Sequence, residues 1–294
     1  MEYLLQQIIN SLALGGIYAL IAIGLALIFS VMGLINFAHG ELMTVGGYAI
    51  FFATLFGAPF WLALLISLLV AAIFGALMEI IAFRPFRNAD IVTMLLTSFA
   101  VSSILHVLFQ NAIGARPKAI AVPSILSGAL TLGPFNFGTI SIFAIVATIV
   151  CLVLLVAFLK GTHIGITMRA AAQDFEITRL MGVNANAVLL LAFTISGVLA
   201  AVASILWIFQ RGAVEPTMGT YPILKAFIVV VLGGLGSIPG AVLGGISLGT
   251  LEVFLRAYLP ESILPFRDAI SLSLVIGIFT FYPNGILGRA EEIR

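Results

Sequence analysis

The sequence predicts an all-α, polytopic membrane protein with about eight transmembrane helices, within a range of seven to nine. Of its 294 residues, 62% are hydrophobic and only 9% are charged, whereas a soluble domain carries about 25% charged residues. The mean hydropathy is +1.24, and several uncharged runs reach the ~20 residues that cross a bilayer as a helix. Backbone groups in lipid must be hydrogen-bonded within their own segment, and the runs lack the alternation of a membrane barrel strand, so helices are predicted.

Nine hydrophobic segments follow one another along the chain, five of them long enough to span a bilayer and four of them shorter. The long runs are Ile8–Val31, Trp61–Phe83, Ile91–Ile113, Thr139–Leu159 and Ala187–Phe209. The short segments are Leu42–Phe56, Ile270–Tyr282 and the two halves of Ala226–Leu255. We divide Ala226–Leu255 near Ser237–Gly240, because it is too long for one ordinary span and because proline and glycine break helices. The whole chain, residues 1–294, is predicted to be one membrane domain in which some short segments do not cross fully.

Three further features bound the organisation of the chain. The first run is interpreted as a retained span, because MEYLLQQIIN lacks a basic n-region and a small-residue cleavage site. The connection Gly114–Gly138, which contains three prolines, is predicted to be an ordered external loop with room for a short surface helix. The single cysteine, Cys151, excludes an internal disulfide framework and a cysteine-rich metal site.

Residues 160–186 are a hydrophilic insertion between two apolar runs, and we interpret them as a cytoplasmic docking loop. Within this loop, Met168–Leu180 is good helix-forming sequence with three successive alanines, and Gly182 is placed to end the helix. The charges of the helix include Arg169, Asp174, Glu176 and Arg179. Such a helix either inserts into a groove on a soluble partner or lies on lipid headgroups as an amphipathic interfacial helix. Composition alone does not separate the two.

The docking interpretation also predicts the orientation of the chain. If residues 160–186 are cytoplasmic and all nine segments cross, the N-terminus lies outside and the C-terminus lies in the cytoplasm. The 13 Lys and Arg residues divide almost evenly between the two sides, so the positive-inside rule adds no independent support.

A polar constellation of Asn36, His39, Glu41 and Thr44 separates the first two hydrophobic segments. A histidine and a carboxylate beside hydrocarbon are costly unless they are paired or wet. Asn36 and His39 are three residues apart, so a helix would place them on one face. The group either lines or gates a path through the membrane, with His39 sensitive to pH near neutrality, or forms a polar cap at the membrane boundary.

Other polar and glycine-rich positions also allow two interpretations each. Gly233, Gly234 and Gly236 either interrupt a helix beside a pathway or permit close helix packing. Thr97, Ser98, Ser102 and Ser103 either form a polar stripe or hydrogen-bond their own helix. For Lys225 and Glu252, snorkelling and a boundary position would satisfy the charges without a role in transport. Two segments, Gly40–Gly47 and Leu224–Gly234, share a faint internal repeat, which we call the internal echo: in each, a charged residue precedes a short run that ends in Gly-Gly.

Three motifs closely resemble the branched-chain amino acid ABC importer permeases, specifically their shorter, H-type membrane subunit. They are LINFAHGELMTVGGY (Leu34–Tyr48), RAAAQDFEITRLMGVN (Arg169–Asn184) and VLGGLGSIPGAVLGG (Val231–Gly245). The resemblance covers essentially the whole chain in order. It implies a second, different permease subunit, two cytoplasmic ATP-binding subunits and an external substrate-binding protein as partners, besides a small amino-acid substrate and membrane lipid.

The resemblance also implies that Arg169–Asn184 occupies the coupling-helix position within a coupling loop at residues 160–186. The Glu-Ala-Ala motif of other importer classes is absent, and the corresponding sequence here is Arg-Ala-Ala-Ala. The expected ATPase-coupling residues are Arg169, Ala170, Ala171, Asp174, Glu176, Arg179 and Gly182. The expected substrate-pathway residues are Asn36, His39, Glu41, Thr44, Thr97, Ser98, Gly233, Gly234 and Gly236.

The expected function is that of a permease subunit in a bacterial or archaeal cytoplasmic (inner) membrane, forming half of the pathway for branched-chain or other hydrophobic amino acids. Related permeases import urea, short amides or other amino acids, and these substrates stay open. A self-contained channel or secondary transporter is the alternative from another class, but no coupling-ion site or continuous pore is recognisable.

Several activities are set aside from the residues. The chain has no phosphate-binding G-x-x-x-x-G-K-[ST] motif, so ATP and Mg are expected in partner subunits, and the chain itself is not expected to be an enzyme or to hold a cofactor. Three scattered histidines give no metal-ligand spacing. No basic cluster is dense enough to predict binding to nucleic acid.

Overall fold

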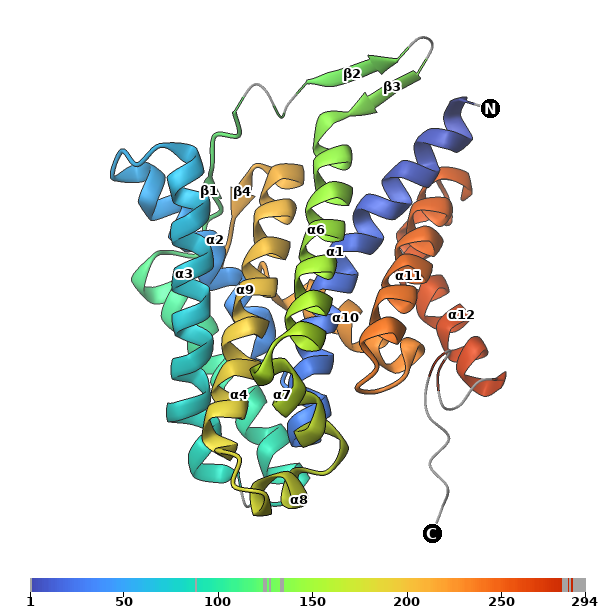
Figure 1. The fold of residues 1–294 in the computed structure, drawn as a ribbon. Coiled ribbons are helices and arrows are strands. Elements are labelled where there is room, and N and C mark those ends of the chain that lie inside the picture. Colours follow the sequence, from blue (N-terminus) through green and yellow to red (C-terminus); the bar gives the residue numbers. More distant parts are fainter. Residues whose placement is uncertain are drawn as a thin grey trace.

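The chain folds into a bundle of helices (Figure 1), seen in a computed structural model that describes residues 2–87, 89–123, 126, 128–132, 135–281, 285 and 287. The helices are α1 (Glu2–Met32), α2 (His39–Leu55), α3 (Phe60–Met78), α4 (Ile91–Ala112), α6 (Thr139–Gly161), α7 (His163–Gln173), α8 (Phe175–Leu180), α9 (Ala185–Arg211), α10 (Thr220–Gly233), α11 (Ile238–Tyr258) and α12 (Arg267–Phe281). A π-helical turn (Glu79–Phe83) and a 3-10 turn (Arg84–Phe86) extend α3, and a second 3-10 turn (Leu264–Phe266) precedes α12.

The predicted fold class is confirmed. Six helical stretches are long and apolar enough to cross a membrane: Tyr3–Met32, Phe60–Phe86, Ile91–Ala112, Thr139–Gly161, Ala185–Arg211 and Ile238–Tyr258. Each remaining predicted segment is also a helix, but a shorter one, with 17 residues in α2, 14 in α10 and 15 in α12. The described part of the chain is therefore an all-α membrane bundle that mixes full-length and short segments.

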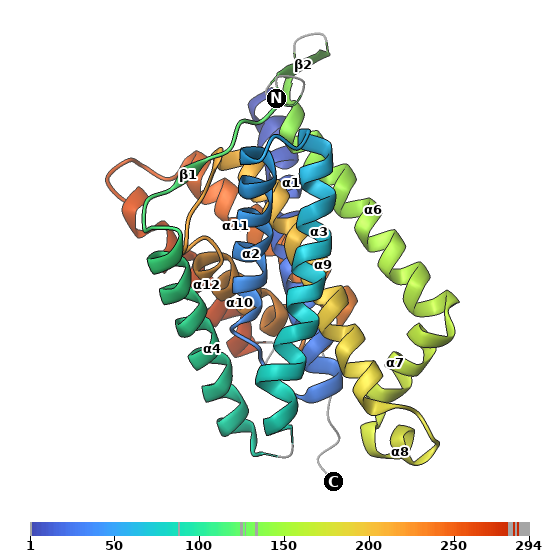
Figure 2. The ribbon, with the colours of Figure 1, turned by 90° about the vertical axis from the view of Figure 1, so that its left-hand side faces the viewer.

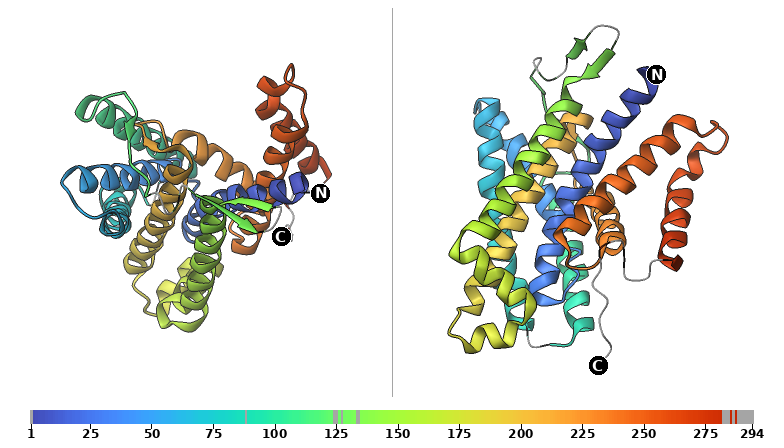
Figure 3. Two further views of the ribbon diagram at one scale, coloured as in Figure 1. Left: turned by 90° about the horizontal axis from the view of Figure 1, so that it is seen from above. Right: turned by 45° about the vertical axis from the view of Figure 1, so that its right-hand side comes forward.

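Helix α1 is the centre of the bundle, although it opens the chain. Its flanks pack against α11, α9, α10 and α6, and views from the side and from above show it enclosed by them (Figures 1 and 3). The contact with α11 depends on small residues, because a side chain at Gly15 or Gly245 would collide with the backbone of the other helix. Helices in lipid associate largely through such close packing.

Helices α3 and α9 cross at a second pair of glycines. A β-carbon on Gly197 would collide with the carbonyl oxygen of Ala71, and one on Gly75 would meet the carbonyl oxygen of Phe193. Both obstacles are backbone atoms, which cannot rotate away as a side chain does. The two helices therefore touch almost backbone to backbone, which maximises dispersion contacts in the absence of a hydrophobic driving force.

We expect Gly197→Ala to destabilise the protein by about 1–3 kcal/mol, the usual cost of overpacking. The matched control is Gly277→Ala on α12, where a β-carbon meets no atom within 4 Å. Since alanine is the better helix former, the control is expected to be neutral or slightly stabilising. Thermal unfolding of both purified variants in detergent checks the difference, and an equal midpoint for the two variants would contradict the tight α3–α9 contact.

The long hydrophobic stretch near the C-terminus is broken at Gly234–Ser237, slightly before the predicted division at Ser237–Gly240. Gly234 and Gly236 have φ values of +105° and +76°, in the region that favours glycine. The Ser237 hydroxyl then accepts a hydrogen bond from the amide of Gly240 at 3.1 Å and caps α11. Pro239 consequently lies in the first turn of α11, where its missing N–H has no cost, rather than in the break.

The connection between α4 and α6 contains short strands, which the prediction of a loop with a surface helix missed. Strand β1 (Lys118–Ala119) pairs antiparallel with β4 (Ala213–Val214), and β2 (Ala129–Leu132) pairs with β3 (Phe135–Gly138). The β1–β4 partners are distant in sequence, so their pairing leaves no local signal. Residues 124, 125, 127, 133 and 134 of this connection lie outside the described residues, so the expected surface helix stays a prediction.

The short helices α2 and α10 meet at their N-terminal ends inside the bundle. Gly219 lies so close to Gly40 that a β-carbon on either residue would collide with the other's carbonyl oxygen. The Gly219 amide donates a hydrogen bond to the Thr44 hydroxyl at 3.2 Å. The helices that carry the two segments of the internal echo are thus in contact near their starts, and α2 runs from the middle of the bundle towards the end that carries the N-terminus (Figure 2).

Candidate functional site

The hydrophilic loop 160–186 folds into two helices, α7 and α8, at the end of the bundle opposite the N-terminus (Figure 1). The prediction of one helix over Met168–Leu180 is wrong at Asp174, which is extended with φ −153° and ψ 106°. The Asp174 carboxylate accepts a hydrogen bond from the amide of Ile177 at 2.9 Å and so caps α8. Aspartate competes with the helix in this way, and here it starts a new helix instead of continuing the old one.

One face of α7 packs on the bundle, and most of the remaining loop residues face solvent, with Thr178 buried. Gly165, Met168 and Ala171 are buried, and α7 contacts α6, α1 and α9. Of the predicted coupling residues, Ala171 therefore faces inward, whereas Arg169, Ala170, Asp174, Glu176, Arg179 and Gly182 are exposed. Gly182 has φ +86° and ends the loop helix, as predicted.

The tip of the loop carries three exposed apolar side chains that the sequence analysis did not single out. Ile177 is 57% exposed, Met181 81% and Leu180 86%. We call Ile177, Leu180 and Met181 the apolar tip. In the sequence, these residues are the apolar positions of EITRLMG. They are easily overlooked because charged residues lie among them. Apolar groups clustered at a polar end of a protein are typical of a site that another molecule covers.

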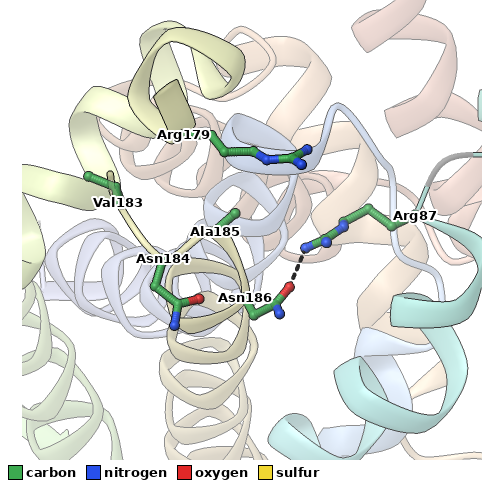
Figure 4. A pocket seen from close by; sticks show the side chains of 6 residues that line it. All are labelled: Arg87, Arg179, Val183, Asn184, Ala185 and Asn186. Atoms are coloured by element: carbon green, nitrogen blue, oxygen red, sulfur yellow. Dashed lines mark hydrogen bonds between the residues drawn. The ribbon is translucent and has the colours of Figure 1, made fainter. Parts of the chain in front are cut away.

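A polar recess of about 280 Å³ adjoins the loop (Figure 4), and two of its lining residues, Arg179 and Val183, flank Leu180 and Met181 in the chain. It is lined by Arg87, Arg179, Val183, Asn184, Ala185 and Asn186. Arg87 donates a hydrogen bond to the amide oxygen of Asn186 at 2.7 Å and so joins the α3–α4 connection to the start of α9. Within the described part of the chain, neither arginine has a carboxylate within 4.0 Å. The recess therefore presents positive charge from two separate connections.

The α3–α4 connection is itself held by local contacts. The buried Glu79 binds Arg84 through two hydrogen bonds, of 3.2 and 2.6 Å. Asp90 caps α4 by accepting hydrogen bonds from the hydroxyl and the amide of Thr93, which lower the pKa of the Asp90 carboxyl. Arg87 is thus placed between two anchored turns and is free to act at the recess.

The predicted polar constellation lies inside the bundle, where Asn36, His39, Glu41 and Thr44 are all buried. Asn36 and His39 do not share a helix face as predicted, because α2 begins only at His39. The Asn36 side-chain oxygen instead accepts a hydrogen bond from the amide of Ala38 at 3.0 Å and stabilises the turn before α2. An asparagine commonly forms such a local turn at the expense of a helix.

His39 is fixed by a hydrogen-bonded chain across three helices. The Ser196 hydroxyl donates to the carbonyl of Gly24 at 3.0 Å and lies 2.9 Å from His39 Nδ1. Ser196 Oγ and His39 Nδ1 share one hydrogen bond, in which the tautomer of the imidazole sets the donor. His39 thereby ties α2 to α9 and, through Ser196, to α1.

Helix α4 brings part of the predicted polar stripe to this constellation. The Ser102 hydroxyl donates to Glu41 Oε1 at 3.0 Å, and the Ser98 hydroxyl accepts from the amide of Phe37 at 3.4 Å. Thr97 instead bonds the carbonyl of Thr93 on its own helix at 2.8 Å, and Ser103 is exposed. Of the two predicted pathway residues on α4, the structure therefore joins Ser98, and not Thr97, to the buried polar group.

The predicted glycines of the α10–α11 region serve packing and turn geometry. A β-carbon on Gly233 would collide with the backbone of Gly240 on the other arm of the hairpin. Gly234 and Gly236 supply the left-handed conformations of the turn.

A buried charge network lies where α1, α10, α11 and α12 meet. Lys225 Nζ is 2.6 Å from Glu252 Oε1 and 3.3 Å from Asp268 Oδ1. The Tyr18 hydroxyl donates to Glu252 at 2.8 Å, and the Tyr221 hydroxyl donates to Asp268 at 3.0 Å. Snorkelling of the lysine and a boundary position of the glutamate are therefore wrong: the two charges neutralise each other inside the protein.

Within the part of the chain that the structure describes, no group of three His, Cys, Asp or Glu side chains is placed to hold a metal ion. The candidate sites are the solvent-exposed loop with its apolar tip at one end of the bundle and the buried polar group near its middle.

Comparison with known proteins identifies the family. Residues 7–279 match the model of a family described as the permease component of the branched-chain amino acid transport system. The chain is 36% identical to the high-affinity branched-chain amino acid permease BraD of Pseudomonas aeruginosa, over 98% of this chain and 96% of BraD. It is 34% identical to LivH of Escherichia coli, over 98% and 97% of the two chains. It is 30% identical to a probable branched-chain amino acid permease, LivH, of Methanocaldococcus jannaschii, over 92% and 88%. The chain belongs to the family of permease components of branched-chain amino acid transport systems.

Proposed function

We propose that the chain is a transmembrane subunit of an ABC importer for branched-chain or other hydrophobic amino acids. It forms half of the pathway, and a second, different permease forms the other half. Two cytoplasmic subunits bind and hydrolyse ATP with Mg, and an external binding protein delivers the substrate. The assembly resides in the cytoplasmic membrane of a bacterium or archaeon.

The observation that carries this proposal is the apolar tip beside two arginines that have no carboxylate within 4.0 Å among the described residues. An interfacial helix needs an apolar face for lipid, whereas Met168 and Ala171 of α7 are packed on the bundle and, of its large apolar side chains, only Ile164 and Ile166 are exposed. The apolar tip is flanked by Arg179 and Glu176, which suits a protein groove with a charged rim better than hydrocarbon. We therefore assign residues 160–186 to ATPase coupling.

The proposed orientation follows from that assignment. ATP-binding subunits are cytoplasmic, so α7 and α8 face the cytoplasm and α1 begins outside, because the two lie at opposite ends of the bundle (Figure 1). The strands β2 and β3 and the β1–β4 pair then lie on the external side, where the binding protein would dock.

The coupling loop is placed to act as a lever. Helix α6 ends at Gly161 directly before α7, and α9 begins at Ala185 directly after the loop. Gly165 holds the start of α7 against the backbone of Phe158 and Leu159 on α6. A displacement of the loop is therefore transmitted to α6 and α9, and from α9 to α3 through their glycine contact. Nucleotide drives this motion only through a difference in its interaction with the two states of the complex.

Reconstitution of the complete assembly in proteoliposomes tests the proposal. We expect uptake of L-leucine that requires ATP, both permeases, the ATP-binding subunits and the binding protein. Unlabelled valine or isoleucine should compete with this uptake. Omission of any one component should stop uptake. Full uptake by this chain alone would identify a channel or secondary transporter, and competition by urea or acetamide, in place of valine, would reassign the substrate.

A further inference from the structure

An apolar groove of about 600 Å³ lies between α2, α3 and α4, on the half of the bundle that the proposed function places outside. Figure 2 shows α4 beside α2 along this side. The groove is lined by Val45, Tyr48, Ala49, Phe52, Ala53, Phe56, Ala58, Ile66, Val70, Phe74, Phe109 and Ile113. Its volume falls in the range of about 300–1,000 Å³ that is usual for small-ligand pockets.

Helical spacing places a polar pair at the inner end of the groove. Val45 and Ala49 follow Glu41 by one and two helical turns on α2, and therefore continue the same face. On α4, Phe109 follows Ser102 by two turns in the same way. The hydrogen bond between Ser102 and Glu41 therefore lies beyond the lining residues, one helical turn before Val45 and about two turns before Phe109, on the side of the middle of the bundle.

Two buried polar atoms on this face have no hydrogen-bond partner among the described residues. They are Glu41 Oε2 and the hydroxyl of Tyr48, and both side chains are buried. Leaving a buried acceptor unpaired costs about 1–3 kcal/mol, more when the group is charged. These two of the eight such atoms among the described residues lie along one helix face, where a ligand in the groove would complete them.

We propose that the α2–α4 groove is the substrate site of this subunit, resting on the function proposed above. The α-ammonium of an amino acid binds Glu41 at the inner end, and the branched side chain lies between Tyr48, Phe52 and Phe109. The carboxylate attracts a cation, the walls accept only an apolar group, and Tyr48 adds one hydrogen-bonding group. The site thereby selects zwitterions with apolar side chains over acidic or strongly polar ones.

Two other occupants fit an apolar groove in a membrane protein, namely a lipid acyl chain and a helix of the neighbouring permease. Neither uses the unpaired carboxylate oxygen at the inner end, whereas an ammonium group does, through a charge-assisted hydrogen bond. The charge complementarity therefore favours the amino acid, and the two alternatives become outcomes of the tests below.

The first test is kinetic and uses the complete reconstituted importer. We expect Glu41→Gln to raise KM for L-leucine about tenfold or more, since one charge-assisted hydrogen bond of the substrate is weakened. Ser102→Ala should change KM in the same assay, while the matched variant Ser103→Ala, on the exposed side of α4, should behave as wild type. Unchanged KM in both Glu41→Gln and Ser102→Ala would overturn the proposal.

The second test measures occupancy directly and does not require that a polar variant fold. Ala49→Cys in a Cys151→Ser background places one thiol in the groove. We expect a charged methanethiosulfonate reagent to label it in the assembled complex, and saturating L-leucine, but not L-glutamate, to slow the labelling. Absence of labelling would show a groove filled by lipid or by the second permease, and labelling that L-leucine does not slow would show a groove without substrate; each result overturns the proposal.

The two proposals fail in different ways. If the wild-type assembly imports L-leucine while the groove variants match it and leucine gives no protection, the groove inference falls and the importer function stands. If the wild-type assembly with all partners imports no amino acid, the proposed function falls and the substrate site falls with it.

Discussion

Replacing Leu180 and Met181 together by serine is expected to reduce ATP-driven leucine uptake by about 30-fold or more, which corresponds to the loss of one interface hot spot of about 2 kcal/mol. The two side chains are the most exposed of the apolar tip, at 86% and 81%. Their removal costs the bundle itself little, because they contact little of it. The ATP-binding subunits, in contrast, lose the apolar contact that anchors them.

The measurement compares uptake with the ATPase activity of the same proteoliposomes. Uptake should fall while the protein still inserts, and less ATP-binding subunit should co-purify with the complex. The conservative pair Leu180→Met and Met181→Leu keeps the apolar surface and should retain wild-type uptake. Wild-type uptake by the serine variant would show that the apolar tip does not bind the ATP-binding subunits.

Substitutions of the charged residues around the apolar tip should reduce uptake less, and their effects should be separable. Arg179 lines the recess and is exposed, so its removal weakens a rim contact whose contribution is modest in water. Asp174 caps α8 through Ile177, so Asp174→Asn keeps the cap and removes only the charge. Replacing Arg169, Asp174, Glu176 and Arg179 together therefore combines two effects, and a cap-preserving variant is needed to separate loss of docking from loss of α8.

Lys225→Met should destabilise the protein by about 3–5 kcal/mol, the cost of leaving a buried charge without its partner. Lys225 is the only cation within 4.0 Å of Glu252 among the described residues, and both side chains are buried. Removing it leaves Glu252 with the Tyr18 hydroxyl alone. Asp268 is affected less, because it is half-exposed and retains Arg267 at 3.6 Å.

Thermal unfolding of the purified variants in detergent measures this effect. The double variant Lys225→Met and Glu252→Leu removes both charges and should recover most of the lost stability, since replacing a buried pair by apolar groups is often neutral. The exposed Lys160→Met serves as the control, with a midpoint close to wild type. A single variant as stable as the control would show that water or a partner satisfies Glu252.

The helical segments could be predicted because lipid imposes a simple rule on each of them separately. Every long apolar run is a helix, and the glycine-rich break lies within a few residues of the predicted division. Boundaries at polar residues were predicted less well. Asp174 divides the loop helix and Asn36 lies outside α2, because the side chain of each bonds a nearby backbone amide, an option that composition does not reveal.

The contacts within the candidate sites were harder to predict from the sequence, because they depend on the tertiary structure. The sequence marked Asn36, His39, Glu41 and Thr44 as a polar group between two apolar segments, and the fold brings these residues to the interior. It did not indicate that Ser102 and Ser196 are partners of Glu41 and His39, since these pairs join distant helices. Arg87 was missed for the same reason: it reaches the recess from the α3–α4 connection through Asn186.

Composition and the length of its apolar runs determined by themselves that this chain is a helical membrane protein with a hydrophilic loop at residues 160–186, because the cost of unpaired backbone in lipid acts on each segment independently. Only the tertiary structure decided which face of α7 is free, that Lys225 and Glu252 neutralise each other, and that an apolar groove opens between α2, α3 and α4. These features arise from contacts between helices far apart in the sequence, where close packing selects one arrangement among many that the same segments would allow.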